Sequence, residues 1–199
     1  MITYSEFLNK SEMSKEELLA WGKQSLVDDA PGLIPSLPAP PMLMFDRITH
    51  IEHTKKRGRI VAEQDINLDA WFFLCHFSND PVQPGCLGVD AVWQLLGMYC
   101  ALRGALGSGR ALGCNEVDFF GQIRPHDNIV KYDVSIRRYS TIRGTNLVIG
   151  NAEISVDGTA VYTMTDARVG VFPDLQYPDY PAKSENSKGG VLIRKENTA

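Results

Sequence analysis

The segment PGCLGVDAVWQLLGMYCAL, residues 84–102, carries one carboxylate and one amide in an otherwise apolar run. Proline suits a first helical turn, so the segment predicts a helix from Gly85 to Leu102. A helix that is apolar on every face is buried in the protein core. Burying an unpaired carboxylate is costly or makes it retain a proton, so a chain that keeps Asp90 in this helix is expected to use it.

The same helix is nearly long enough to cross a bilayer. Asp90, Gln94 and the glycines at positions 88 and 97 argue against a membrane span, and the chain holds no second candidate. The first six residues lack a basic region followed by an apolar run, so we expect no signal peptide. The favoured interpretation is the core helix of a cytoplasmic protein that does not enter a membrane.

Composition narrows the function classes. The 199 residues suffice for one domain with a sizeable core, and 44% of them are hydrophobic. The net charge of −4 argues against nucleic acid or an anionic membrane surface as a partner. The four cysteines contain no Cys-x-x-Cys pair, and His50 and His53 stand beside a basic run without a third ligand, so we expect no metal site.

Six segments around the helix alternate apolar and polar residues, as strands do. These predicted strands cover residues 42–48, 59–66, 111–123, 128–139, 145–156 and 159–172. The first two are expected to form a hairpin, and Asp157-Gly158 is a strong hairpin signal between the last two. This order predicts an α+β protein in which an antiparallel sheet wraps around a long central helix. One curved sheet covers only part of such a helix, so we also expect a homodimer.

Three regions divide the chain. Residues 1–36 hold a short helix over residues 15–21, opened by a capping box of Ser14 and Glu17, and a proline-rich lead-in. Residues 37–172 form the sheet domain, in which the run Trp71-Phe72-Phe73 is expected in the core. Residues 173–199 are polar and lack periodicity, which is typical of a disordered or loosely docked tail.

His76, Gly85 and Asp90 together offer acid–base chemistry. Gly85 lies at the helix start, where backbone N–H groups are unpaired and the dipole is positive, so it forms an oxyanion site for a ligand carbonyl. Histidine is a base near neutral pH. Asp90 is an acid if burial keeps it protonated, and Gln94, four residues on, can orient it. These groups suffice to eliminate a β-hydroxyl next to a carbonyl.

Simpler roles remain open for each residue. His76 beside Phe77 can be a hydrogen-bonded structural histidine, Asp90 can cap a buried polar group, and Gly85 can be a plain helix start. Residue types and spacing alone do not choose between these roles and catalysis.

A long motif resembles the signature of the bacterial β-hydroxydecanoyl-[acyl carrier protein] dehydratase/isomerase family of fatty acid synthesis. It reads His76-Phe77-x-x-Asp80-Pro81-x-x-Pro84-Gly85-Cys86-Leu87-Gly88-x-Asp90-Ala91-x-Trp93-Gln94-Leu95. The resemblance extends over about residues 37–172. It implies a hot-dog fold, a homodimer with shared active sites, and a tunnel for a medium-length acyl chain on the phosphopantetheine arm of acyl carrier protein. It implies no further cofactor.

The resemblance also implies roles for individual residues. His76 and Asp90 match the catalytic pair, which in this family comes from opposite subunits. Gly85 matches the glycine whose N–H polarises the thioester carbonyl, and Val82 matches the residue whose backbone carbonyl orients the histidine. Aspartate rather than glutamate at position 90 resembles the bifunctional type, which also moves the trans-2 double bond to cis-3. The expected substrate-binding residues are Val82, Gly85, Cys86 and Gln94.

Docking of an acidic carrier protein on a chain of net negative charge requires clustered cations. Arg137, Arg138 and Arg143 stand near one expected strand end, with Lys131 and Arg168 as candidate additions. They form either a carrier-protein patch or an ordinary solvated strand edge.

Other functions stay open. One is a dehydratase without isomerase activity, and another is an acyl thioesterase on the same fold, in which Asp90 activates water. A non-catalytic acyl-binding protein is disfavoured, because an inert binder has no need for an acid and a base. Gln83 departs from the family pattern inside the motif and leaves the chain-length preference open.

Overall fold

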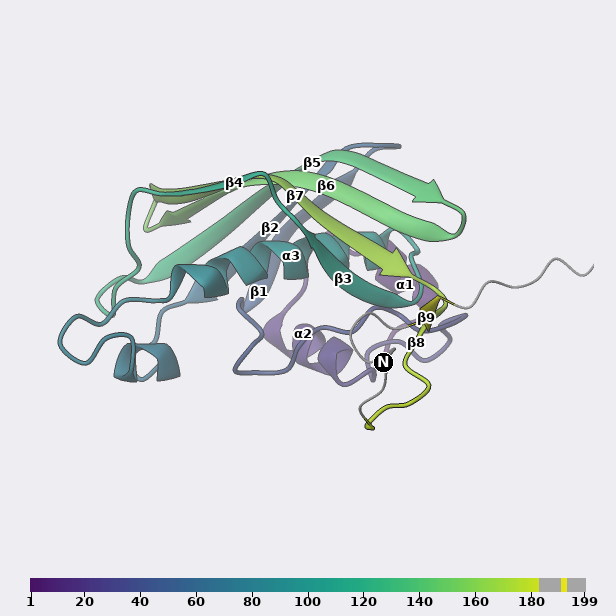
Figure 1. Cartoon of the computed structure of the whole chain (residues 1–199), viewed down its shortest axis with the longest axis horizontal. Helices are drawn as coiled ribbons and strands as arrows, with labels where there is room; N and C mark the ends of the chain where they lie inside the picture. The colour runs from purple at the N-terminus through teal and green to yellow at the C-terminus, as the bar shows by residue number, and fades with distance from the viewer. Residues whose placement is uncertain (183–190, 193–199) are drawn as a thin grey trace, which may run out of the picture.

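The computed structural model of the chain describes residues 1–182 and, for the backbone alone, residues 191–192. A seven-stranded antiparallel sheet lies over the long helix α3, Gly85–Leu102, and the short N-terminal helices lie on the other side of α3 (Figure 1). The strand order is β1-β2-β5-β6-β7-β3, and β4 pairs with β7. The predicted α+β architecture, a sheet around a central helix, is confirmed.

The remaining elements have the following bounds. The strands of the sheet are β1 Arg47–His53, β2 Gly58–Asp65, β3 Ser108–Gly113, β4 Glu116–Phe119, β5 Ile129–Ile142, β6 Thr145–Val156 and β7 Thr159–Phe172. The others are α1 Tyr4–Leu8, α2 Lys15–Gly22, the 3-10 turn η1 Trp71–Leu74, β8 Leu175–Gln176 and β9 Val191–Leu192. The predictions for α3, β6 and β7 are confirmed at both ends, as is the hairpin at Asp157-Gly158, where both residues have positive φ.

Helix α3 is buried on two sides and partly exposed on the third. The sheet covers one side with alternating residues such as Val130, Tyr132 and Val134, all with no exposed surface. This agrees with the expectation that one sheet covers only part of the helix. A stripe along α3 stays partly exposed because neither the sheet nor the N-terminal region reaches it. Its residues are Cys86, Val89, Asp90, Trp93, Gln94 and Gly97.

This helix is also long and apolar enough to cross a membrane by length and composition. Within the described residues, however, 61% of it is buried inside the fold. That burial is typical of a core helix.

The first predicted strand is wrong in its position. Residues 42–46 lie outside the sheet, and β1 begins at Arg47. Met44 and Phe45 are buried against the core, so their apolar character reflects packing and not strand pairing. The second predicted strand is confirmed within one residue as β2, and β1 and β2 form the expected antiparallel hairpin.

The predicted strand over residues 111–123 is wrong in its extent, because it is two strands. Gly113 has a φ of +122°, where the chain bends, and β3 and β4 on either side both pair with β7. The core prediction for Trp71-Phe72-Phe73 is wrong for Trp71, which is 43% exposed. The tight turn η1 directs only the two phenylalanines inward.

The C-terminal tail is described only in part. Residues 183–190 and 193–199 lie outside the described residues, so the tail prediction is untested there. Before and between these gaps, β8 and β9 form a short antiparallel pair.

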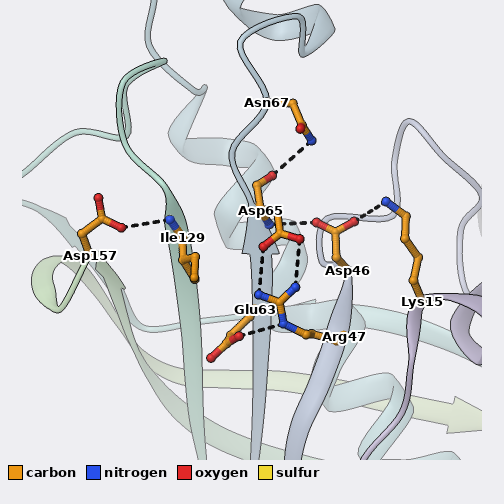
Figure 2. A network of polar contacts seen from close by, with 8 residues as sticks. All are labelled: Lys15, Asp46, Arg47, Glu63, Asp65, Asn67, Ile129 and Asp157. Atoms are coloured by element: carbon orange, nitrogen blue, oxygen red, sulfur yellow. Dashed lines mark hydrogen bonds and ion pairs between the residues drawn. The ribbon is translucent and has the colours of Figure 1, made fainter.

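An ion pair joins helix α2 to the start of the sheet, and further ion pairs lie within the β1–β2 hairpin (Figure 2). Lys15 in α2 lies 2.7 Å from Asp46, which accepts a hydrogen bond from the backbone N–H of Asp65. Arg47 donates two hydrogen bonds of 2.8 Å to the Asp65 carboxylate and a third to Glu63. The capping box of Ser14 and Glu17 opens α2 as predicted. Helix α2 is therefore held at the start of the β1–β2 hairpin.

Candidate active site

His76 is held by Val82 through a pair of hydrogen bonds. The backbone N–H of Val82 donates to the His76 carbonyl at 2.8 Å, and Nδ1 of the imidazole lies 2.9 Å from the Val82 carbonyl. A carbonyl oxygen only accepts, so Nδ1 must carry the hydrogen of this bond. The neutral ring therefore presents Nε2 as its unprotonated, basic nitrogen. This is the contact that the resemblance implies for Val82.

Three further contacts fix the His76 loop. Phe77 and Asp80 exchange backbone hydrogen bonds of 2.9 and 3.1 Å, which close a tight turn. The Asp80 carboxylate lies 2.6 Å from Arg124, and the backbone N–H of Gln83 donates to the Ile123 carbonyl. The loop is thus tied to the segment that follows β4.

Gly85 begins α3, as predicted, and faces the same cavity as His76. The N–H groups at the start of an α-helix lack a carbonyl four residues back, and Pro84 supplies no side-chain cap for them. A Cβ on Gly85 would lie 2.5 Å from the Phe119 ring, so a larger residue there would have to displace this half-exposed side chain. The cavity has a volume of about 310 Å³ and brings four predicted residues together. They are His76, Val82, Gly85 and Cys86.

Asp90 and Gln94 form the second part of the site. Gln94 Nε2 donates to the Asp90 carboxylate at 2.6 Å, as the four-residue spacing predicts. The same amide donates to the Met42 carbonyl at 2.8 Å and accepts from the Met44 N–H at 3.3 Å. Gln94 therefore holds the carboxylate of Asp90 against the segment that precedes β1.

The candidate base and acid do not share a cavity within one chain. Asp90 lines a separate cavity of about 250 Å³ with Gln94 and Gly97. Five residues of an α-helix correspond to a rotation of about 140°, so Asp90 faces a different side of α3 from Gly85. The site is therefore divided between two cavities.

A buried polar cluster next to the His76 cavity was not predicted from the sequence. Gln83 is 4% exposed, and its Nε2 lies 3.5 Å from both Gln64 and Tyr132. Tyr132 donates to Gln64 at 2.7 Å, and burial raises the pKa of Tyr132 and of Tyr162, so both phenols are neutral. The available sequence signal was a glutamine inside a predicted strand, at position 64, and another inside the motif, at position 83. Among the described residues, Gln83 Oε1 has no hydrogen-bond partner.

The candidate docking arginines do not all lie together. Arg137, Arg138 and Arg168 line a cavity of about 940 Å³, on which Arg57 also borders. Arg137 forms an ion pair with Asp166 there. Arg143 lies in the β5–β6 turn, five residues beyond Arg138, which is about 17 Å along an extended strand. The expected proximity of Arg143 to the other two is therefore wrong, because the strand runs on past Arg138.

Lys131 is also remote from that cavity. It lies 3.6 Å from Asp133, on the same strand, and is not among the lining residues. In the part of the chain that the structure describes, no three His, Cys, Asp or Glu side chains gather in a group that can hold a metal ion.

Comparison with known proteins gives one family match. The model of the FabA-like domain family matches residues 37–165. Solved structures of similar fold include the dehydratase heterocomplex ApeI:P from Xenorhabdus doucetiae, with 14% identity over 67% of this chain and 85% of that chain and a TM-score of 0.47. Another is the TT0310 protein from Thermus thermophilus, with 17% identity over 68% of this chain and 100% of that chain and a TM-score of 0.48.

A third is the E. coli PaaI protein from the phenylacetic acid degradation operon. It has 14% identity over 61% of this chain and 80% of that chain, with a TM-score of 0.43. At these identities and TM-scores, the three likenesses carry no weight for function.

Proposed function

Because the chain belongs to the FabA-like domain family, whose hot-dog fold it has, we propose that it dehydrates 3-hydroxyacyl-[acyl carrier protein] to the trans-2-enoyl thioester. It also isomerises the trans-2-decenoyl thioester to cis-3, in unsaturated fatty acid biosynthesis. The observation that carries the proposal is the His76 geometry. The Val82 carbonyl accepts a hydrogen bond from Nδ1–H of His76. The unprotonated Nε2 is then available as a base in the cavity that Gly85 also lines.

The proposed active unit is a homodimer with shared active sites. Within one chain, His76 and Asp90 line different cavities, so the pair is incomplete without a second copy. The exposed stripe of α3 carries Asp90, and a second copy packed against the part of the stripe around Asp90 brings this residue to the partner's His76 cavity. Closed two-fold assemblies are the commonest form of protein oligomer.

The reaction then follows from the placement of three groups. The N–H of Gly85 donates to the thioester carbonyl and acidifies the α-carbon. Nε2 of His76 takes the α-proton, while the carboxyl of Asp90 protonates the departing β-hydroxyl, which leaves as water. The C–H and C–O bonds break and the trans-2 double bond forms. In the isomerisation, His76 removes a γ-proton instead, and a proton returns to the α-carbon as the double bond moves to cis-3.

The proposed partner is acyl carrier protein, which presents the substrate on its phosphopantetheine arm in the cytoplasm, with no further cofactor. Arg137 and Arg138 support this part, because they border a large cavity with two more arginines in a chain of net charge −4. Replacing both by glutamate is expected to reduce turnover of carrier-bound substrate and to spare a small thioester. Arg143→Glu, in the separate turn, is the matched variant. Equal losses on both substrates would contradict carrier docking at this site.

Product analysis from a 3-hydroxydecanoyl thioester tests the reaction. We expect both trans-2 and cis-3 decenoyl products, and losses of roughly 10² to 10⁴ in rate for His76→Ala and for Asp90→Asn. Product containing only the trans-2 isomer would reduce the function to dehydration. Release of free thiol without an enoyl product would instead indicate a thioesterase.

Mixing the two inactive variants tests the shared site. A dimer of one His76→Ala chain and one Asp90→Asn chain contains one intact pair, so statistical exchange should restore about one quarter of wild-type activity. No recovery after demonstrated subunit exchange would show that base and acid come from the same chain.

A further inference from the structure

Three glycines of α3 face different surroundings. A Cβ on Gly85 would lie 2.5 Å from Phe119, and one on Gly88 would lie 1.5 Å from the Tyr162 hydroxyl. A Cβ on Gly97 would meet nothing within 4 Å. Glycine inside a helix costs about 0.5–1 kcal/mol relative to alanine. Neighbouring atoms explain the first two glycines, whereas no described residue explains Gly97.

The empty space beside Gly97 belongs to the cavity that Asp90 lines. Gly109 of β3 also lines this cavity, and an added Cβ there would likewise meet nothing within 4 Å. The cavity is a recess within one chain, because α3, β3 and the segment at residues 35–38 all contribute walls. Asp90 and Gly97 are seven residues apart, which is about 10.5 Å along the helix.

We propose that Gly97 and Gly109 set the length of acyl chain that the enzyme accepts, by leaving the far end of this cavity open. The inference rests on the proposed function, in which Asp90 protonates the β-hydroxyl of the substrate. The part of the acyl chain beyond the β-carbon then extends from Asp90 toward Gly97. The buried side chains of Met98 and Val169 line the same cavity and offer an apolar wall for methylene groups.

The cavity favours an acyl chain over a polar ligand. Asp90 and Arg110 are the charged residues that line it, and Gln94 already uses its amide on Asp90 and the backbone of residues 42–44. The guanidinium of Arg110 already donates to the Gly109 carbonyl at 2.6 Å and to the Tyr177 hydroxyl at 3.2 Å. The remaining surface is largely apolar, and burial of each methylene group favours binding about fourfold.

Chain-length profiles of wall variants test this inference. Gly97→Leu and Gly109→Val would be assayed with 3-hydroxyacyl thioesters of four to ten carbons on one small thiol. Gly97→Ala is the control, because it changes the same position with a side chain too small to fill the cavity. A leucine that excludes about three methylene groups should lower kcat/KM for the ten-carbon substrate about 60-fold. The four-carbon substrate should change no more than about threefold, since its chain ends before Gly97. Gly109→Val should act in the same direction.

Each alternative outcome can be recognised. If kcat/KM for the ten-carbon substrate is unchanged in both variants, the acyl chain binds elsewhere and the inference is overturned. Equal losses at every chain length, with dissociation in size-exclusion chromatography, would overturn it too and make Gly97 a contact between copies. If circular dichroism shows that Gly97→Leu does not fold, Gly109→Val tests the inference from β3. Failure of the wild-type chain to dehydrate any substrate would refute the proposed function itself.

Discussion

Alanine substitutions at Gly88 and Gly97 should change the stability of the protein in opposite directions, although both residues lie in α3. Any Cβ at Gly88 would overlap the Tyr162 hydroxyl at 1.5 Å and its Cζ at 2.6 Å. Tyr162 is 2% exposed and packs against Phe119, with ring centroids 5.0 Å apart, so it has little room to move. The substitution therefore forces α3 away from β7.

The expected magnitudes follow from these distances. Overpacking a core costs about 1–3 kcal/mol, and a contact as close as that at Gly88 belongs at the upper end of this range. The higher helix propensity of alanine offsets about 1 kcal/mol of this cost, so Gly88→Ala should lower the free energy of unfolding by about 2 kcal/mol. Gly97→Ala has the same propensity gain and no clash, so it should raise that free energy by about 0.5–1 kcal/mol. The gap between the variants is about 3 kcal/mol.

Urea unfolding followed by circular dichroism measures this gap. With a slope of about 2 kcal/mol per molar urea, the two midpoints should differ by about 1.5 M. All samples need the same chain concentration, because association stabilises the folded state. Adding Tyr162→Phe to Gly88→Ala removes the nearest atom and should recover part of the loss. Two variants that shift the midpoint in the same direction would refute the reasoning.

Three other outcomes are expected. Gln94→Leu should lower kcat by about 10- to 100-fold, because the hydrogen bond to Asp90 is lost. The effect should be absent in an Asp90→Asn background. Additive effects of the two substitutions in this double-mutant cycle would contradict the prediction. Arg47 lowers the pKa of the Asp65 carboxyl, so the pair stabilises the fold above about pH 4 and loses that contribution as the pH falls further. Because the pair is half-exposed, Arg47→Met should cost no more than about 1 kcal/mol at pH 7, and its difference from wild type in urea midpoint should disappear in acid. Burial raises the pKa of the Cys100 thiol to about 12, so iodoacetamide at pH 8 should leave this cysteine unlabelled in mass spectrometry until urea unfolds the chain.

Much of the fold could be predicted from local patterns. The ends of α3 follow from Pro84-Gly85 and from the apolar run itself, and the Asp157-Gly158 turn follows from two residues that tolerate positive φ. The first strand was predicted wrongly, because Met44 and Phe45 are buried in the core without pairing with any strand. Apolar character predicts burial more directly than it predicts strand pairing.

The contacts of the candidate site were likewise predictable only where the residues are close in the chain. His76 with Val82, and Asp90 with Gln94, are close in the chain, so spacing and the motif predicted their contacts. The burial of Gln83 was not predictable, because Gln64 and Tyr132 reach it from β2 and β5. Contacts between distant segments depend on how whole elements pack.

The amino-acid sequence by itself therefore determined most elements of this protein and the short-range pairs of its site, because both depend on neighbours a few residues apart. Only the tertiary structure decided that His76 and Asp90 line different cavities within one chain. It also decided that Tyr162 fills the space beside Gly88, whereas the space beside Gly97 is empty. The physical reason is that the surroundings of each side of α3 are set by segments distant in the chain, and no local pattern records which segment covers which side.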